Sequence, residues 1–215
     1  MRITRLGLAA TITCAALIGC AHQGGAGGAN SDEGDDEQEL DVRDVAAEAK
    51  VSLVDAVRAA HAARPGKIVE AELEGEVEGG IRAVFYEMTI VDDGKAFEVK
   101  VDAATGKVTS VEVEDDAEEA AEMLALAASM PPHTRGLGDF LKIAEGRAPS
   151  ARAVKAEFAV EHGRAIYEVE LLRGRDLLET DVDVLHPDMK ADVKEPEDEK
   201  DEGDEEDEGA EDDEK

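Results

Sequence analysis

Apolar and polar residues alternate with a period of two along four segments in the middle of the chain. The alternation covers residues 69–74, 84–90, 97–102 and 108–113, and its polar positions are mostly glutamate, lysine or aspartate. A period of two predicts strands that bury one face and expose the other. Between the second and third segments, Asp92-Asp93-Gly94-Lys95 has the composition of a tight hairpin turn.

The period changes to that of a helix just before these strands. Ser52-Leu53-Val54-Asp55 has the form of a capping box, and the apolar stripe that follows ends at Arg64-Pro65-Gly66. The same order then returns. A helical stripe over 137–144 ends near Pro149 and is followed by alternating segments at 154–158, 166–169 and 178–183. The middle of the chain therefore contains an internal repeat.

The repeat sets the predicted fold and the domain boundaries. An extra helix precedes each copy, over 42–50 and over 117–129. We predict an α+β fold of tandem two-layer units, each with two helices packed on an antiparallel sheet of about four strands. The first domain spans 40–114 and the second 115–194. The last strand of the second copy is weak, because His186-Pro187 replaces the Thr105-Gly106 of the first.

The first copy resembles the PepSY family. The resemblance rests on a strand at Ile68–Glu74, on Tyr86-Glu87-Met88, and on a hairpin running from Asp93-Gly94-Lys95 to Thr105-Gly106-Lys107-Val108. It covers residues 51–114 well and 134–190 only loosely. PepSY domains occur in propeptides of secreted metallopeptidases and in small envelope proteins. The resemblance thus implies a role in binding or regulating a peptidase, and it marks strands and turns instead of a reactive site.

The N-terminus has the features of an export signal. Arg2 and Arg5 precede a mostly apolar run that is too short for a permanent transmembrane helix. Leu17-Ile18-Gly19-Cys20 resembles the lipobox of bacterial lipoproteins, which implies cleavage after residue 19 and acylation of Cys20 with a palmitate-type chain. An ordinary secretory signal with a chance cysteine is the alternative.

Cysteine usage agrees with a lipid anchor. The chain has two cysteines, Cys14 and Cys20; cleavage discards the first and acylation modifies the second. The mature protein would then have no free thiol for a disulfide, a nucleophile or a zinc site. Ala21 follows in place of the aspartate associated with inner-membrane retention. This predicts an envelope protein on the outer membrane, facing the periplasm or the surface, in an organism with two membranes.

The charge of the chain lies mainly at its ends. The formal net charge is −31, and residues 195–215 hold 15 acids and two lysines, a net of −13. Residues 20–39 are rich in glycine and acids, which predicts a flexible tether, and the tail should be disordered. A chain of this sign is unsuited to nucleic acid, whose phosphates require clustered lysine and arginine. The tail could bind Ca²⁺ weakly and diffusely, but it lacks the ligand spacing of an EF-hand.

The sequence offers little for catalysis. No His-Glu-x-x-His, Gly-x-Ser-x-Gly or phosphate-loop motif is present, and its histidines are not paired at helical spacing. We therefore expect no enzyme, no cofactor, no metal site and no small-molecule substrate.

Three functional classes remain. The preferred one is a lipid-anchored module that binds an envelope protein such as a peptidase and inhibits or regulates it. The candidate contact loops are the Gly79-Gly80 turn and the hairpin turn of Asp92, Asp93, Gly94 and Lys95. The alternatives are a protein whose acidic segment buffers or senses divalent cations, and a structural acidic surface coat.

Overall fold

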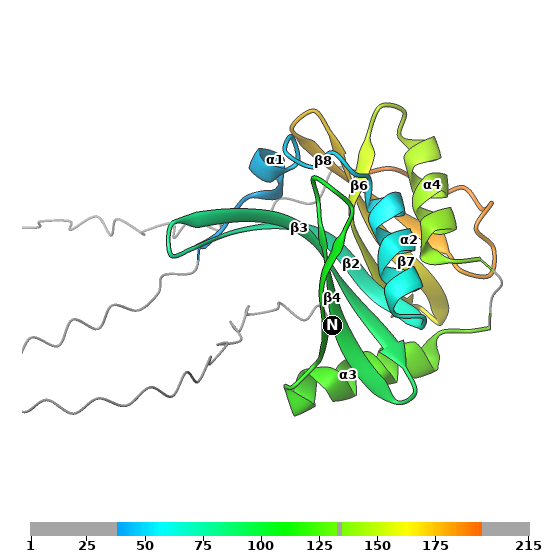
Figure 1. Cartoon of the computed structure of the whole chain (residues 1–215). Helices are drawn as coiled ribbons and strands as arrows, with labels where there is room; N and C mark the ends of the chain where they lie inside the picture. The colour runs from blue at the N-terminus through cyan, green and yellow to red at the C-terminus, as the bar shows by residue number, and fades with distance from the viewer. Residues whose placement is uncertain (1–37, 133–134, 195–215) are drawn as a thin grey trace, which may run out of the picture.

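The computed structural model describes residues 38–132 and 135–194. The predicted leader, Cys20, most of the tether and the acidic tail lie outside the described residues. In the described part, one antiparallel sheet of eight strands is packed with four helices (Figure 1). In chain order, these are β1 (Gln38–Glu39), α1 (Val42–Val45), α2 (Leu53–Ala63), β2 (Lys67–Glu78), β3 (Ile81–Asp92), β4 (Lys95–Asp102), β5 (Val108–Val113), α3 (Ala117–Ser129), α4 (Leu137–Arg147), β6 (Arg152–Glu161), β7 (Arg164–Arg173) and β8 (Asp176–Asp183).

A single sheet joins the two halves of the chain. The strand order is β5-β4-β3-β2-β6-β7-β8, with β1 paired to the far end of β2. The first half, α2 and β2–β5, meets the second half, α4 and β6–β8, where β2 and β6 pair antiparallel. We had predicted tandem two-layer units, each with its own sheet of about four strands. The structure differs because the inner strands of the two sheets hydrogen-bond to each other and leave no edge between the halves.

The β2–β6 pairing is centred on residues that the repeat makes equivalent. Ala71 lies opposite Ala156, with Glu70 opposite Glu157 and Glu72 opposite Lys155. In the sequence repeat, Ala156 occupies the position of Ala71, so the two halves are related by an approximate two-fold axis through this pair. Each inner strand also carries an irregularity at the matching place, between Ile68 and Glu70 in β2 and between Ala153 and Lys155 in β6.

The long helices cover one face of the sheet. Helices α2 and α4 pack side by side, α2 over the first half and α4 over β6–β8. The Ser52 Oγ accepts a 3.1 Å hydrogen bond from the amide of Asp55 and donates one of 2.8 Å to its carboxylate. This is the cap expected at the start of α2. On α4, the buried stripe contains Leu137, Phe140, Leu141 and Ala144.

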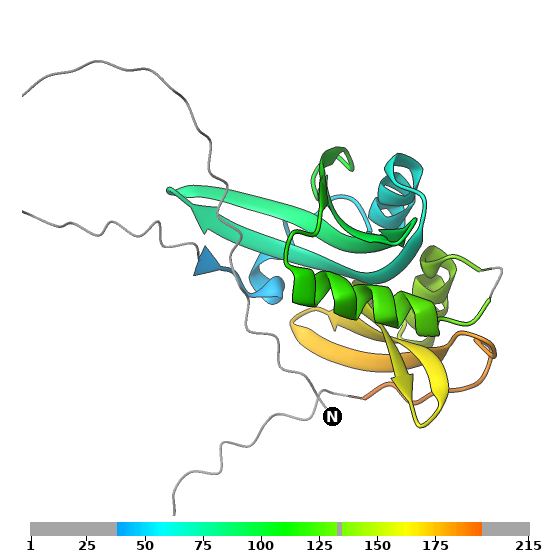
Figure 2. The same ribbon diagram turned by 90° about the horizontal axis from the view of Figure 1, so that it is seen from below.

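Helix α3 lies on the opposite face. It contacts β2, β3, β4 and β6, most of the strands that α2 covers from the other side. Figure 2 shows α3 between the strands of the two halves. The Lys67 Nζ donates a 2.6 Å hydrogen bond to the Ala127 carbonyl oxygen and ties α3 to the start of β2. We had assigned this helix to the second domain, but it packs chiefly on strands of the first.

Two further expectations differ from the structure. The helix expected over 42–50 is a single turn, α1, capped by the Asp41 carboxylate on the Arg43 amide. In the second half, no fourth strand follows β8 within the described residues. One isolated bridge between Glu179 and Lys194 takes its place. The sequence had indicated this weakness at His186-Pro187, yet a unit of about four strands was too many here.

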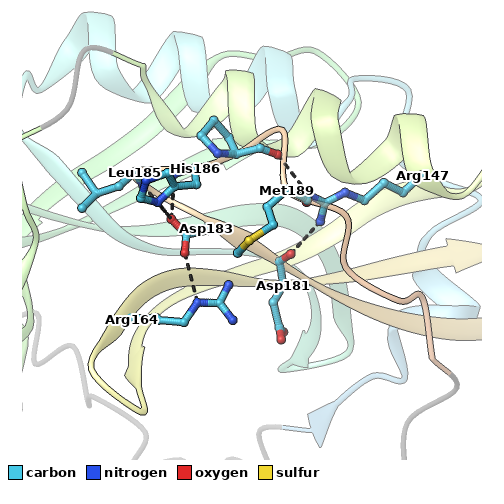
Figure 3. Close-up of polar contacts among 8 residues, drawn as sticks. Arg147, Arg164, Asp181, Asp183, Leu185, His186 and Met189 are labelled. Atoms are coloured by element: carbon cyan, nitrogen blue, oxygen red, sulfur yellow. Dashed lines mark hydrogen bonds and ion pairs between the residues drawn. The ribbon is translucent and has the colours of Figure 1, made fainter.

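The chain after β8 is held by two side chains, which Figure 3 shows. The Arg147 guanidinium donates to the carbonyl oxygens of Asp181 at 2.6 Å, Pro187 at 3.1 Å and Met189 at 2.7 Å. The Asp183 carboxylate accepts from the amides of Leu185 and His186 at 2.9 and 2.7 Å, and pairs with Arg164 at 3.1 Å. These contacts fix an irregular segment that has almost no backbone pairing of its own.

The core between the helices and the sheet is apolar and includes two tyrosines. The Tyr167 ring packs against Phe140 and Phe158, and its hydroxyl donates to the Ile68 carbonyl oxygen at 2.8 Å. The repeat-matched Tyr86 donates to the Val51 carbonyl oxygen at 2.6 Å. Each buried hydroxyl therefore has the partner that burial requires. No described helix combines the length and the apolarity that crossing a membrane requires.

Candidate interaction surface

The face of the sheet opposite α2 and α4 carries most of the charge of the described strands. Residues that lie opposite each other in an antiparallel sheet point to the same side. The strand register therefore arranges the glutamates of the alternating segments in rows that run across the sheet. Two adjacent rows each cross all seven strands from β5 to β8, and they include residues of both halves.

The first row, which we call the acidic row, is acidic at all but one of its positions. From β5 to β8 it consists of Glu112, Glu98, Thr89, Glu70, Glu157, Glu168 and Asp181. Like charges directly opposite each other destabilise a sheet, by up to about 1 kcal/mol per pair. The pairs Glu70–Glu157, Glu157–Glu168 and Glu168–Asp181 are all of this kind. Such a row lowers the stability of the fold.

The second row, which we call the mixed row, contains two lysines. It consists of Ser110, Lys100, Glu87, Glu72, Lys155, Glu170 and Glu179. The Lys100 Nζ lies 3.1 Å from Glu87 and 3.3 Å from Glu98, and the Lys155 Nζ lies 2.8 Å from Glu72 and 3.4 Å from Glu70. Each lysine thus bridges the two rows, and the remaining carboxylates outnumber the lysines.

Crowding and partial burial change the protonation of these carboxyl groups. Burial, together with the neighbouring Glu98 carboxylate, raises the pKa of Glu87 to about 7. Burial and the charges of Glu161 and other neighbouring acids raise the pKa of Glu168 to about 7 as well. The pKa of Glu74 rises to about 9, through burial, the charge of Glu87 and a hydrogen bond with Glu72. Glu87 and Glu168 can therefore change charge near neutral pH, whereas Glu74 remains protonated there.

The pKa values of the two lysines are also raised, which keeps the lysines charged. Although burial lowers the pKa of Lys100, the carboxylates of Glu87 and Glu98 more than offset it, and the pKa lies above its usual value. Lys155 behaves in the same way beside Glu72 and Glu70. Both stay cationic, so the charged face keeps its two fixed positive groups while part of its negative charge depends on pH.

The predicted contact loops lie at opposite ends of β3. Gly79 and Gly80 form the β2–β3 turn with φ values of +55° and +80°, at the tip of a hairpin that projects beyond the sheet (Figure 1). Asp93 and Gly94 form the β3–β4 turn with φ values of +48° and +75°. Its Asp92 carboxylate pairs with Arg64, at the end of α2, at 3.0 Å. Because β3 has 12 residues, the turns are about 40 Å apart and cannot contact one small epitope together.

The remaining candidate residues are dispersed. His61 lies in the last turn of α2, and His162 lies in the β6–β7 turn. The His186 Nδ1 lies 3.4 Å from the Asp183 carboxylate. Across residues 38–132 and 135–194, no three or more His, Cys, Asp or Glu side chains are grouped so that they could hold a metal ion. The predicted lipidation site, Cys20, is outside the described residues.

Sequence reasoning missed the acidic row as a unit. The alternation of Glu70, Glu72 and Glu74 placed these side chains on one face of a strand. The alignment with Glu157 and Glu168 depended on the β2–β6 pairing, which no local pattern indicates. A possible indication was that the polar positions of the predicted strands are nearly all acidic, since a solvated sheet face usually mixes threonine, lysine and serine with glutamate.

Comparison with known proteins finds one family match, within the first half of the chain. Residues 50–112 match the PepSY family, described as the peptidase propeptide and YPEB domain. The matched span contains α2 and β2–β4, with all but the last residue of β5. No curated protein sequence matches the chain.

Among solved structures, the chain is similar to one described as a "putative lipoprotein" from Clostridium difficile 630. The two share 18% sequence identity with a TM-score of 0.39, over 67% of this chain and 94% of the other.

Proposed function

We propose that this chain is a lipid-anchored envelope protein whose charged sheet face binds a basic surface of another envelope protein. PepSY domains occur with peptidases, so a peptidase that is inhibited or regulated by this contact is the first candidate partner. The PepSY match at residues 50–112 supports the class of function. The anchor rests on Leu17-Ile18-Gly19-Cys20, and the second half would be a diverged second copy of the domain.

The acidic row is the observation that carries this proposal. Its opposed like charges lower the stability of the fold, and the sheet would be more stable with threonine or lysine at alternate positions. A surface that is kept at a cost in stability is typical of a functional site. A partner with lysine or arginine side chains would relieve the repulsion, so complementary charge would favour its binding and speed its encounter.

The two rows also determine what kind of partner fits. They are backbone-rigid, since every position belongs to a strand of one sheet, and the side chains of Glu72, Glu87 and Glu98 remain 23–30% exposed. Little ordering would therefore be needed on this side of the contact. Glu70 is only 4% exposed on this face, which α3 also covers, so the partner would contact the acidic row at Glu157, Glu168 and Asp181. It would present cations in a line, as an extended basic segment or the edge of a basic sheet does.

Capture from solubilised envelope tests the proposal with matched variants. The bait is residues 21–215, and its variant carries Glu157→Gln, Glu168→Gln and Asp181→Asn in the acidic row. The control carries Asp115→Asn, Glu118→Gln and Glu122→Gln, which remove the same charge at exposed positions around α3. We expect a partner that is retained by the wild type and the control and reduced at least tenfold by the acidic-row variant.

The outcomes separate the functional classes. Equal capture by both variants would refute the role of the acidic row. Capture that requires residues 195–215 and calcium would instead assign the function to the tail, as the cation-responsive alternative predicts. If the captured partner is a peptidase, its activity is measured with and without the wild-type protein. The anchor is tested separately, because Cys20→Ser should move the protein out of the membrane fraction.

A further inference from the structure

A cavity of about 720 Å³ opens between the N-terminal half of α4, the C-terminal half of α2 and the start of β2. It lies on the face covered by α2 and α4, away from the two charged rows. Small-molecule sites in proteins have volumes of about 300–1,000 Å³, so this cavity has the size of such a site. The PepSY match includes the α2 and β2 residues that line the cavity, but the proposed partner contact does not involve it.

The floor of the cavity is apolar and well packed. Its side chains are each at most 9% exposed, and they come from α2, α4, β2, β7 and the end of α3: Val54, Val57, Ile68, Met130, Leu137 and Tyr167. The Tyr167 hydroxyl already donates a hydrogen bond to the Ile68 carbonyl oxygen. The floor therefore offers apolar contact and almost no hydrogen-bonding groups.

The rim of the cavity is cationic, in contrast to the chain as a whole. Its charged residues are Arg58, Lys67, Arg135 and Lys142, with one acid, Asp139; His61 also lies there. The whole chain has 54 acids and 23 bases. A rim with four bases and one acid reverses that ratio.

The rim cations are only partly neutralised by the protein. Lys142 and Arg135 lie 3.8 and 3.9 Å from Asp139 and Asp188, at the limit of an ion pair. Lys67 contacts the neutral carbonyl oxygen of Ala127, so its charge is not offset. Arg58 alone has a short ion pair, 3.0 Å from Asp55. An anionic ligand group at the rim would therefore gain charge-assisted hydrogen bonds.

We propose that this cavity binds a single-chain anionic amphiphile, a fatty-acid carboxylate, with the alkyl chain on the apolar floor and the carboxylate among the rim cations. The acidic tail of the same chain is the alternative source of negative charge for the rim. It could meet the cations, but residues 195–215 contain no apolar side chain larger than proline and could not fill the floor. A ligand with both an anionic head and an apolar chain satisfies both parts of the site.

Two glycines on α4 provide a matched pair of variants. A Cβ at Gly138, which lines the cavity, would lie 3.7 Å from Val54 Cγ1, an ordinary contact, so Gly138→Leu should place its side chain in the cavity. A Cβ at Gly146 would meet nothing within 4 Å, and Gly146 is outside the cavity. Leucine favours a helix more than glycine does, so both variants should fold.

The experiment measures binding of dodecanoate to residues 21–215 by titration calorimetry, below the concentration at which dodecanoate forms micelles. This chain keeps every contact described above, since all of them lie within residues 38–194. We expect saturable binding of one dodecanoate, at least tenfold weaker in Gly138→Leu and unchanged in Gly146→Leu. Thermal unfolding shows that both variants are folded. Equal affinity of the two variants, or no binding to the wild type, would overturn the proposal.

Charge and source are tested in parallel. Dodecyltrimethylammonium, with the same chain and opposite charge, should bind at least tenfold more weakly, and Lys142→Gln should weaken dodecanoate severalfold while exposed Lys107→Gln leaves it unchanged. Equal binding of both amphiphiles would contradict the cationic rim. Binding that appears only when residues 195–215 are deleted would assign the cavity to the tail. Retention on phosphatidylglycerol vesicles that Gly138→Leu abolishes, without dodecanoate binding, would assign it to a phospholipid surface.

Discussion

The two halves of the sheet begin alike and end differently. Asp102 and Asp183, at the ends of β4 and β8, are repeat-matched, and each carboxylate accepts a hydrogen bond from a backbone amide three residues later, of Thr105 or His186. After this shared turn, the first half returns as β5. The second half continues as an irregular segment held by Arg147 (Figure 3). A turn that recurs in the two halves of one chain can thus be followed by a strand or by a segment held by side-chain hydrogen bonds, which we call the Arg147 clamp.

The largest expected effect comes from breaking the clamp. Arg147→Ala removes hydrogen bonds to three carbonyl oxygens and to the Thr180 hydroxyl, and should lower the free energy of unfolding by about 3 kcal/mol. The repeat-matched Arg64 has one ion pair with Asp92 and stacks on Phe97 at 3.6 Å, so Arg64→Ala should cost about 1 kcal/mol. Urea denaturation of both variants measures the difference. Equal losses would show that the clamp does not stabilise the second half.

The shared turn gives the next largest effect. Asp183→Asn weakens two backbone contacts and the ion pair with Arg164, and should cost about 2 kcal/mol, against about 1 kcal/mol for Asp102→Asn. Burial opposes but does not prevent the lowering of the Asp183 pKa by the His186 amide and Arg164. Its stabilisation is therefore lost as pH falls below about 4. The difference in melting temperature between pH 3 and pH 5 should therefore be smaller for the variant than for the wild type.

A pH dependence is expected in both halves from one repeat-matched pair. Burial raises the pKa of Glu87 and Glu168 from 4.5 to about 7. The folded protein therefore binds protons that the unfolded chain has released, and the free energy of unfolding falls as pH rises from about 4.5 to 7. For Glu87 the change is about 2 kcal/mol, reduced from the full shift by residual exposure.

Variants at these positions distinguish the two halves. Glu87→Gln and Glu168→Gln should each flatten the dependence of the melting temperature on pH. Lys100→Gln should steepen it, because Lys100 lies 3.1 Å from Glu87 and favours its charged form. In the second half, the position that matches Lys100 is Asp181, so Glu168 has no equivalent lysine that could be removed. A Glu168→Gln profile that follows the wild type would contradict the shared origin of the effect.

The smallest effect concerns the outer edges of the sheet. At the β5 edge, Val111 and Val113 are 44% and 52% exposed, whereas the β8 edge is bridged by Lys194. Val111→Lys should change stability by less than about 0.5 kcal/mol. It should lower self-association at high concentration, because a charged edge resists strand pairing. Sedimentation velocity measures this, with Ala125→Lys, at an exposed position of α3 away from the edge, as the control for added charge alone.

The sequence predicted elements far better than their assembly. The strands at 69–74, 84–90 and 97–102, the turn at Asp93-Gly94 and the Ser52 cap were all readable, because each depends on residues close together in the chain. The pairing of β2 with β6 was not, because both strands alternate in the same way and either could have been an edge. Helix α3 was misplaced for a similar reason: its apolar stripe shows that it packs, but not on which half.

The candidate sites divide along the same line. The two turns were predicted from their glycine and aspartate residues. That they lie a full length of β3 apart could be seen only in the folded structure. The acidic row and the cavity between α2 and α4 combine residues from strands or helices that are distant in sequence, such as Glu70 with Glu157 and Val57 with Leu137. No single segment carries enough of either to identify it.

The pairing of Ala71 with Ala156 has a consequence for symmetry itself. Two identical copies of the first half, joined in this register, would place Glu70 opposite Glu72 twice, so that four acids surrounded the axis without a base. In the single chain, the position matching Glu70 is Lys155, which contacts both Glu72 and Glu70. Two repeats within one chain can carry different residues at equivalent positions, whereas two identical subunits cannot. Covalent linkage thus permits a neutralising substitution at the centre that identical subunits could not make on one side alone.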